Sequence, residues 1–424
     1  MSLGRKLFLV VFLIFFSFKA GKSITYIEID SPTQRLYRLA FFIHPKDKGP
    51  SERIERVLKR CLEISHLFEL VDLPSNGSVT PQNIDYATLK RKEVELVLSV
   101  KVETSGKEVL LSSFLFDPLG ESLIKAKTYR SSQEGVNLIC YKLVDEILET
   151  LTGRSGIFCS RIAFIRQIHP YRELWMIYPE GSGEMPLLRQ TLCMSPRFSP
   201  DGKKLLLTNF KRMNPDLYML ELETGKLNLV SSKPGPNSAP SWSPDGKKVV
   251  LSLRGTKGFL DLFLLDLNAG SLTALTETPY TETSPSFSPD GKRLVFVSDR
   301  TGNPQLYIMD LESRKSKPLT QFGSYNAEPS WSPQGDWIAF SGRWEGEFKI
   351  FIIRPDGSDL RLLTPYKGNH QNPSWAPNGR HLVFSSDMRE PRSLYLTTIQ
   401  KGGPWALTFP KEGDGQPYWS GILF

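Results

Sequence analysis

Short apolar and polar runs alternate over the C-terminal two-thirds of the chain, and the pattern recurs at a nearly constant interval. Each unit opens with Pro-x-aromatic, passes through Ser-Pro-Asp-Gly or a close variant, and continues with short strand-like runs. The opening prolines stand 44 or 45 residues apart and are Pro196, Pro240, Pro285, Pro329, Pro373 and Pro417. Four short antiparallel strands per unit predict the blade of a β-propeller, with Asp-Gly supplying the positive φ angles of a tight hairpin.

Incomplete units flanking the full repeats predict how the ring closes. Residues 161–164 and 173–177 match the middle strands of a blade but lack a proline-led strand before them, and residues 417–424 contain such a strand. Together these fragments make one blade, so five whole blades and one shared blade predict a six-bladed propeller. Sharing a blade between N- and C-terminal strands removes free sheet edges and locks the ring.

The preceding region has a different pattern, which predicts a small α/β domain over residues 24–155 and the propeller over residues 156–424. Apolar residues at helical spacing follow Pro50, and a second amphipathic helix begins near Val136 and ends at Gly153. Residues 154–156 resemble a hinge between the two domains. The expected strands are 26–30, 36–43, 95–102, 108–116 and 123–128.

The first 23 residues have the pattern of a secretory signal peptide. Arg5 and Lys6 precede an unbroken apolar run over residues 7–18, which is shorter than the about 20 residues that a membrane-spanning helix needs. Cleavage after Ala20 and cleavage after Ser23 are both compatible with the pattern. We therefore expect an exported, soluble protein with no direct membrane insertion after signal cleavage.

The amino-acid composition does not indicate a particular function, and the net charge argues against nucleic-acid binding. The 424 residues are 40% hydrophobic and 23% charged, which is typical of globular proteins, with a net charge of +8. Removing the signal peptide removes four basic residues, Arg5, Lys6, Lys19 and Lys22, so the mature charge is +4. This small excess, spread over a large ring, does not predict nucleic-acid binding.

Cysteines, histidines and turn aspartates offer few candidate sites. Cys61 and Cys140 lie on the apolar stripes of the two predicted helices, so we expect them to be buried. Cys159 and Cys193 are the better candidates for a disulfide, which an exported protein can form. The five histidines lack metal-ligand spacing, and turn formation accounts for the aspartates of the Asp-Gly pairs. We therefore expect no metal, no cofactor and no catalytic residue.

Polar residues that differ between blades stand directly before the proline-led strands. In a propeller this position gathers at the mouth of the central channel, where loops carry both solvent and function. We expect a partner-binding face there, with acidic character from three carboxylates, although a merely wet loop surface is the simpler alternative. The candidate residues are Asn237, Ser238, Glu282, Thr283, Ser284, Asn326, Glu328, His370, Gln371, Asn372, Asp414 and Gln416.

The order of these parts resembles the TolB family, the periplasmic propellers of the Tol-Pal envelope system. The likeness covers the signal peptide, the α/β domain, the Pro-Ser-Trp-Ser-Pro-Asp-Gly blades, and a junction formed by residues 148–153, Phe158 and residues 161–164. It implies a non-enzymatic, monomeric periplasmic scaffold that binds the peptidoglycan-associated lipoprotein at the channel mouth. It also implies a role in outer-membrane integrity and in envelope constriction at division.

The resemblance further implies that the mature N-terminal segment binds TolA. That segment alternates apolar and polar residues, which suits strand addition to a partner sheet, and it equally suits an internal strand of the α/β domain. The residues are Ile24, Thr25, Tyr26, Ile27, Glu28, Ile29 and Asp30.

Residues carry over only in part from the family to this chain. Thr283 matches a lipoprotein-contact threonine of the family, whereas Ser284 stands where an acidic residue is expected and Pro236 replaces a histidine. The alternative function is a propeller enzyme that acts on peptides or glycans through Glu282, Glu328 and Asp414 as paired acids.

Overall fold

The computed structural model describes residues 35–44, 49–73, 85–400 and 402–421. The predicted signal peptide, the predicted strand 26–30 and the TolA segment lie outside these residues. In the described part of the chain, none of the helices combines the length and apolar character needed to span a bilayer.

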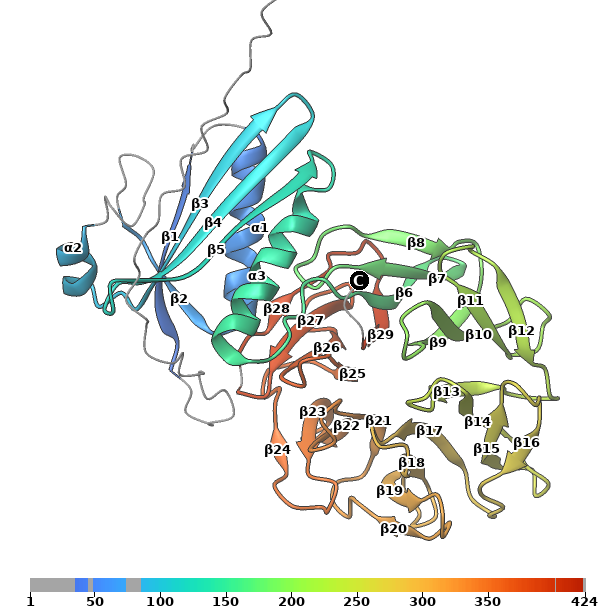
Figure 1. The fold of residues 1–424 in the computed structure, drawn as a ribbon. Helices are drawn as coiled ribbons and strands as arrows, with labels where there is room; N and C mark the ends of the chain where they lie inside the picture. Colours follow the sequence, from blue (N-terminus) through green and yellow to red (C-terminus); the bar gives the residue numbers. More distant parts are fainter. Residues whose placement is uncertain (1–34, 45–48, 74–84, 401, 422–424) are drawn as a thin grey trace, which may run out of the picture.

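Six four-stranded antiparallel sheets surround a common centre, as predicted (Figure 1). Blade 1 is the shared blade and contains β29 (Asp414–Trp419), β6 (Ile162–Ile168), β7 (Tyr171–Ile177) and β8 (Met185–Leu188). Blade 2 contains β9 (Cys193–Phe198), β10 (Lys204–Asn209), β11 (Asp216–Glu221) and β12 (Leu227–Ser231). Blade 3 contains β13 (Ser238–Trp242), β14 (Lys248–Arg254), β15 (Leu260–Asp266) and β16 (Leu272–Ala274).

The remaining three blades repeat this arrangement, and the proline-led strand is innermost in every blade. Blade 4 contains β17 (Glu282–Phe287), β18 (Arg293–Ser298), β19 (Gln305–Asp310) and β20 (Ser316–Pro318). Blade 5 contains β21 (Asn326–Trp331), β22 (Ile338–Trp344), β23 (Glu347–Ile353) and β24 (Arg361–Leu362). Blade 6 contains β25 (His370–Trp375), β26 (His381–Ser386), β27 (Ser393–Thr398) and β28 (Trp405–Ala406).

The Asp-Gly turns join the first two strands of a blade through a fixed set of hydrogen bonds. In blade 3, Ser243 Oγ donates to Asp245 Oδ1 at 2.5 Å and accepts from the Lys248 amide at 2.9 Å. Gly246 has a φ of 68°, as the turn requires. Blades 2 and 4 repeat these bonds around Asp201 and Asp290, so the turn role predicted for the aspartates is confirmed.

Blade 1 has no such turn because its first two strands come from distant parts of the chain. There, Ser420 takes the place of the turn serine: the Arg161 amide donates to Ser420 Oγ at 3.1 Å, and the Ser420 amide donates to the Arg161 carbonyl at 2.8 Å. Strand β29 pairs antiparallel with β6, with Trp419 opposite Ile162. The closure therefore reproduces the serine contacts of a covalent turn between chain segments 259 residues apart.

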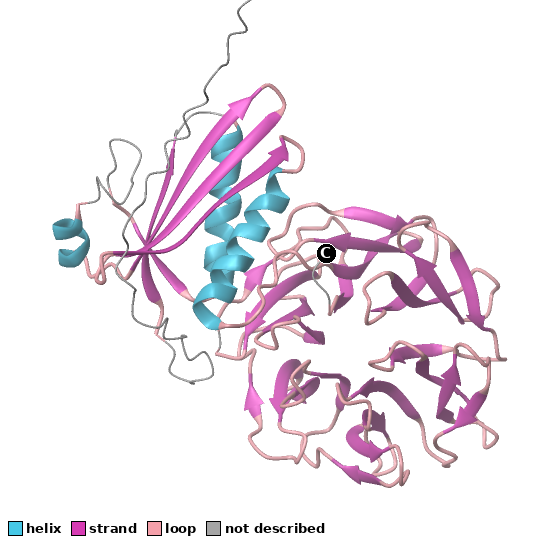
Figure 2. Cartoon of the chain, viewed as in Figure 1, coloured by secondary structure: helices cyan, strands magenta, loops and turns pink. Residues whose placement is uncertain are grey.

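The N-terminal part is a five-stranded sheet with the order β2-β1-β3-β4-β5. Two long helices cover the face that is turned toward the propeller (Figures 1 and 2). The predicted helices and the described predicted strands are all present, whereas β2 and α2 were not predicted because each is too short to show a period. The elements are β1 (Tyr37–His44), α1 (Pro50–Ser65), β2 (Phe68–Val71), α2 (Tyr86–Arg91), β3 (Leu96–Ser105), β4 (Glu108–Asp117), β5 (Ser122–Ser132) and α3 (Val136–Thr152).

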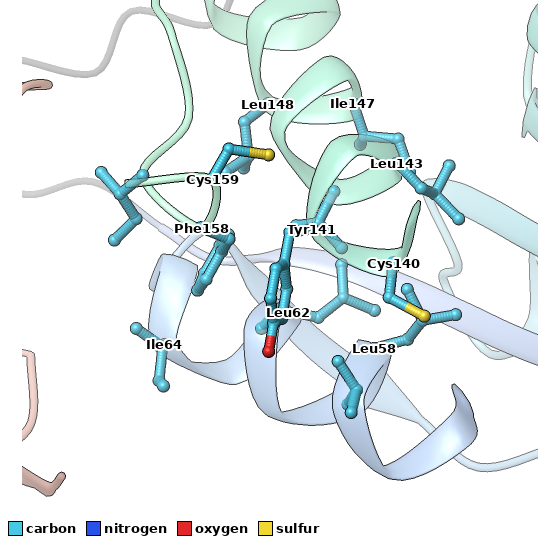
Figure 3. Packing of buried hydrophobic residues seen from close by; sticks show 14 of the residues in the cluster. Leu58, Leu62, Ile64, Cys140, Tyr141, Leu143, Ile147, Leu148, Phe158 and Cys159 are labelled. Carbon is cyan, nitrogen blue, oxygen red and sulfur yellow. The ribbon is translucent and has the colours of Figure 1, made fainter. Parts of the chain in front are cut away.

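The two long helices pack on each other through the apolar stripes that the sequence predicts (Figure 3). Cys61 and Cys140 are fully buried there, as expected for small hydrophobic side chains. Cys159 and Cys193 are also buried and free, so the candidate disulfide is not formed. The Cys193 thiol instead donates to the Arg172 carbonyl at 3.0 Å.

The connection from α3 to the propeller is anchored just after residues 154–156, for which the hinge stays a prediction. The Asp145 carboxylate accepts hydrogen bonds from the amides of Phe158 and Cys159, both at 2.9 Å. A Cβ atom at Gly156 would lie 1.9 Å from Asp145 Oδ1. The backbone therefore approaches the carboxylate as closely as only glycine permits.

Helix α1 docks on the turn end of blade 6, and this contact explains why that repeat departs from the Ser-Pro-Asp-Gly pattern. Nε2 of the His381 ring lies 2.8 Å from the Ile64 carbonyl oxygen, and Nδ1 of the same ring lies 3.0 Å from Asn378 Nδ2. Ala376 and Asn378 replace the usual serine and aspartate in a turn that is buried here. An ionised aspartate in this buried turn would carry a larger desolvation cost than the neutral amide of asparagine does.

Candidate functional site

The segments before the proline-led strands contain two kinds of position, which the sequence did not separate. The residue three places before each proline is 0–2% exposed and lies inside its blade. This corrects the expectation that these residues face a partner: they support the mouth from within. In blade 2 this residue is Cys193, and in the other five blades the residues are Asn237, Glu282, Asn326, His370 and Asp414.

Two of these buried residues are the carboxylates that gave the predicted mouth its acidic character. Asp414 forms an ion pair with Arg166 through two hydrogen bonds of 2.8 and 2.9 Å, and Glu282 pairs with Arg300. Burial raises the pKa of both carboxyl groups, and the arginines act in the opposite direction. Neither group is available to a ligand at the mouth.

The other three buried residues of the predicted set hold the loops that lead into the innermost strands. The Asn237 side chain bonds to the Lys233 backbone and to Ser231, and Asn326 Nδ2 donates to the Phe322 carbonyl at 2.7 Å. His370 lies 2.9 Å from Ser386 Oγ and 3.1 Å from the Tyr366 carbonyl.

The residue immediately before each proline has a positive φ, between 48° and 56°, although it is not glycine. The pairing register shifts at this point in every innermost strand, which identifies a β-bulge. The bulge turns one side chain per blade into the central channel, and we call these six residues the mouth ring. They are Ser195, Ala239, Ser284, Glu328, Asn372 and Gln416.

The mouth ring is uneven, with three small side chains on blades 2 to 4 and three long polar side chains on blades 5, 6 and 1. Two of the long side chains, those of Glu328 and Gln416, bridge neighbouring blades. Glu328 Oε2 accepts from the Asn372 amide at 2.8 Å and from Ser341 Oγ at 2.6 Å. Gln416 Oε1 accepts from the Ser195 amide at 3.0 Å. Hydrogen bonds therefore link neighbouring blades on one half of the ring, and the small side chains of the other half leave more space in the channel.

The charge of the mouth is mixed rather than acidic, contrary to expectation. Of the three predicted carboxylates only Glu328 lines the channel. A cavity of about 400 Å³ beside it is lined by Arg172 and Arg392 as well as by Glu328, Glu412 and Asp414. Arg392 donates to Gln371 Oε1 at 2.8 Å, which places that predicted residue at the rim of the same cavity.

A second cavity, of about 280 Å³, lies between blades 4 and 5 and is lined by Thr283, Ser284 and Glu328. Tyr325 and Phe348 also line it, with their rings in an edge-to-face contact at 5.5 Å between centroids. The structure thus brings together Thr283, Ser284 and Glu328 from the predicted set and adds an aromatic wall. Ser238 lies further around the channel, on blade 3.

Exposed apolar side chains at the mouth end are the feature that sequence reasoning missed. In each blade the register places the loop between the second and third strands beside the start of the innermost strand, as with Glu282, Ser298 and Gln305 in blade 4. Large apolar residues in these loops and in the connections between blades are 36% exposed or more. They are Tyr171, Leu192, Met213, Phe259, Tyr280, Tyr325, Trp344 and Phe409.

Each of these residues stands alone in a polar loop, so no periodic signal marks it. Only the topology shows that the loops share one end of the molecule. Their gathering there resembles a protein-binding surface, where aromatic side chains are enriched. Among the described residues, no group of three or more His, Cys, Asp or Glu side chains could hold a metal ion.

Comparison with known proteins finds a matching family model and relatives of similar sequence. A family model of the TolB β-propeller domain matches residues 148–423. The Tol-Pal system protein TolB of Desulfotalea psychrophila is 31% identical over 236 residues, which are 54% of this chain and 53% of that protein. The protein of the same name from Desulfosudis oleivorans is 31% identical over 204 residues, 46% of each chain. The chain thus spans about half the length of the curated relatives it matches.

A solved structure extends the likeness beyond the propeller. TolB from Acinetobacter baumannii superposes with a TM-score of 0.80 at 24% sequence identity, covering 91% of this chain and 97% of that chain. At this level of identity the likeness concerns the fold, and it includes the small N-terminal domain. Because the family model covers well over half of the sequence, this protein belongs to the TolB β-propeller family.

Proposed function

We propose that this protein is a non-enzymatic scaffold of the Tol-Pal system, exported to the periplasm, where it supports outer-membrane integrity and envelope constriction at division. Residues 1–23 would direct export, and residues 24–155 and 156–424 would form the two mature domains. The matched relatives are named as Tol-Pal system proteins, which supports this assignment.

The mouth end of the propeller is the binding face in this proposal, and the peptidoglycan-associated lipoprotein is its partner. The observation that carries the proposal is the cavity between blades 4 and 5. It combines an aromatic wall of Tyr325 and Phe348 with hydrogen-bonding groups from Thr283, Ser284 and Glu328. An aromatic anchor surrounded by polar groups is the usual composition of an interface hot spot.

The carboxylates support a scaffold rather than a hydrolase. An acid-base pair needs two carboxyl groups that both reach the substrate. Glu282 and Asp414 are buried against Arg300 and Arg166, which leaves Glu328 as the one of the three candidate acids that lines the channel cavity. A glycan or peptide hydrolase built on these three residues is therefore not favoured.

Binding measurements on mouth variants test the lipoprotein assignment. Tyr325→Ala and Thr283→Ala should each weaken binding of the purified lipoprotein about five- to tenfold or more, because both remove part of a central contact. Leu360→Ala is a matched control: Leu360 is 43% exposed and Tyr325 39%, but Leu360 lies in the loop after β23, at the opposite end of the blade. Equal affinities for all three variants and the wild type would contradict the proposal.

The N-terminal segment of the mature chain, Ile24 to Asp30, is proposed to bind TolA and to shift the protein between two states of different lipoprotein affinity. Deleting these seven residues should abolish TolA binding and change the lipoprotein affinity in the same preparation. Loss of TolA binding with an unchanged lipoprotein affinity would retain the TolA site and exclude the switch.

A further inference from the structure

A second set of positions lies below the mouth ring, at the residue that follows each proline, and five of these six residues line the channel. Four of the six blades carry serine here: Ser241, Ser286, Ser330 and Ser374. Blades 2 and 1 carry Arg197 and Tyr418 instead. The channel thus contains one guanidinium, which no other blade matches at this level.

Arg197 has few protein partners for a side chain with five N–H donors. Its Nη1 donates to the Pro196 carbonyl at 2.8 Å, and its guanidinium carbon lies 4.7 Å from the centroid of the Tyr418 ring. Among the described residues, no carboxylate forms an ion pair with it. The channel wall partly buries Arg197, and this burial lowers the pKa of its guanidinium.

Glu328 lines the same cavity but does not neutralise Arg197 by contact. The two residues belong to blades 2 and 5, three blades apart in a ring of six, and therefore face each other across the channel. Glu328 Oε2 is already bound by Ser341 and the Asn372 amide. A charge that is partly desolvated and without a counterion in contact is a site that attracts an anion.

The surroundings of Arg197 are suited to receive such a group. The cavity has a volume of about 270 Å³ and is reached past the small side chains of Ser195, Ala239 and Ser284. Ser241 Oγ accepts from the Phe287 amide at 3.3 Å, and Ser286 Oγ accepts from the Trp331 amide at 3.1 Å. Each hydroxyl keeps its own proton, which it can donate to a ligand in the channel.

We propose that the channel contains a carboxylate-binding site centred on Arg197, with serine hydroxyls of blades 3 and 4 as further donors. The planar guanidinium fork matches the two oxygens of a carboxylate. The carboxylate belongs either to a small organic acid or to an acidic side chain of a chain docked at the mouth, and the second source rests on the proposed function.

Titration with trifluoroacetate at constant ionic strength, followed by fluorine NMR, tests the site in the full mature chain. The wild type should broaden the signal saturably, and acetate should reverse the broadening by competition. Arg197→Gln should weaken binding at least about tenfold, because it removes a charged hydrogen-bonding partner. Arg197→Lys keeps the charge without the fork and should give an intermediate affinity.

Two control variants keep the result interpretable. Arg212→Gln removes an exposed arginine from a mouth-end loop of the same blade and should bind as the wild type does. Glu328→Gln removes the facing negative charge and should strengthen binding. Wild-type affinity in a folded Arg197→Gln or Arg197→Lys variant, or no saturable binding by the wild type, would overturn the proposal.

The lipoprotein distinguishes the two sources of the carboxylate. If a side chain of the docked partner enters the channel, Arg197→Gln should weaken lipoprotein binding and acetate should compete with the lipoprotein. If the site takes a free acid, lipoprotein affinity should be the same in the variant and the wild type. Either result supports the site when trifluoroacetate binds as expected. If the wild type does not bind the lipoprotein at all, this result contradicts the proposed function and does not contradict the carboxylate site.

Discussion

At the turn end of the propeller, blades 2, 3 and 4 repeat the same few hydrogen bonds, whereas at the mouth end no two blades have the same pair of residues before the innermost proline. The serine and aspartate of the turns make equivalent contacts in blades 2, 3 and 4. At the mouth, the corresponding positions of blades 4 and 5 are Thr283-Ser284 and Ala327-Glu328. Repetition therefore marks the residues that form the fold, and variation marks those that are free to bind.

Burial refines this comparison, because variable residues are not all surface residues. Asp414 varies between blades and yet lies inside blade 1, paired with Arg166. In blade 6 the turn end itself departs from the repeat, because helix α1 covers it. The following predictions test whether each position acts through stability or through binding.

Asp414→Ala should have the largest effect on the free energy of unfolding, a loss of about 2–3 kcal/mol. The substitution removes the fully buried one of two carboxylates that pair with Arg166, and the remaining partner, Glu184, is partly exposed. Denaturant unfolding measures the loss, and the double variant Asp414→Ala/Arg166→Met should recover part of it. A loss below about 1 kcal/mol together with lost lipoprotein binding would identify Asp414 as a contact residue instead.

His381 should make the protein less stable in acid, through the contact between α1 and blade 6. Burial lowers the pKa of His381 to about 3, whereas a histidine in the unfolded chain has a pKa of about 6.5. Between these values the unfolded state binds one more proton, so stability falls as the pH falls, by up to about 1.4 kcal/mol per pH unit.

The measurement is the free energy of unfolding from pH 7 to pH 4 in the wild type and in His381→Gln. Between pH 6 and pH 4 the wild type should lose about 2 kcal/mol more than the variant, whatever the variant's starting stability. Parallel curves for the two proteins would show that His381 does not titrate as its burial requires.

Ser243→Ala should cost about 1–2 kcal/mol of unfolding free energy, because its hydroxyl both donates and accepts within the turn of blade 3. Ser420→Ala should cost a similar amount, although its partner Arg161 lies at the other end of the propeller sequence. Lipoprotein affinity should stay unchanged in both variants. An altered affinity would show that the two ends of the blades are coupled.

Tyr325→Ala should change the free energy of unfolding least, by about 0.5 kcal/mol or less, because its side chain is 39% exposed. The same variant should weaken lipoprotein binding. Tyr325→Ala should therefore lower the lipoprotein affinity with little change in stability, whereas Asp414→Ala should lower the stability. Thermal unfolding and a binding titration on one preparation check both. A stability loss as large as that of Ser243→Ala would place Tyr325 among the structural residues.

Most of the fold follows from local patterns in the sequence. The 44-residue period predicts six blades, and the flanking fragments predict the strand pairing of β29 with β6. The apolar stripes of α1 and α3 predict which faces are buried, including Cys61 and Cys140. The short elements β2 and α2 escaped prediction because four to six residues do not establish a period.

The candidate site follows from the sequence only in part. The segments before the prolines can be identified because their residues are polar and vary between blades. These two properties do not separate Glu328, which lines the channel, from Glu282, which is buried. The exposed aromatic residues of the mouth end and the position of Arg197 gave no local signal. Each depends on which loops and strands meet in space.

The number of blades, the closure of the ring and the two-part architecture follow from the sequence alone, because period and polarity act through neighbours along the chain. Which mouth residues face the channel depends instead on how the folded strands meet. The bulge before each proline, with its positive φ, turns one side chain inward while the residue two places earlier is enclosed by its blade. Closing the ring then places Arg197 and Glu328 on opposite sides of one channel, although 131 residues separate them in the sequence.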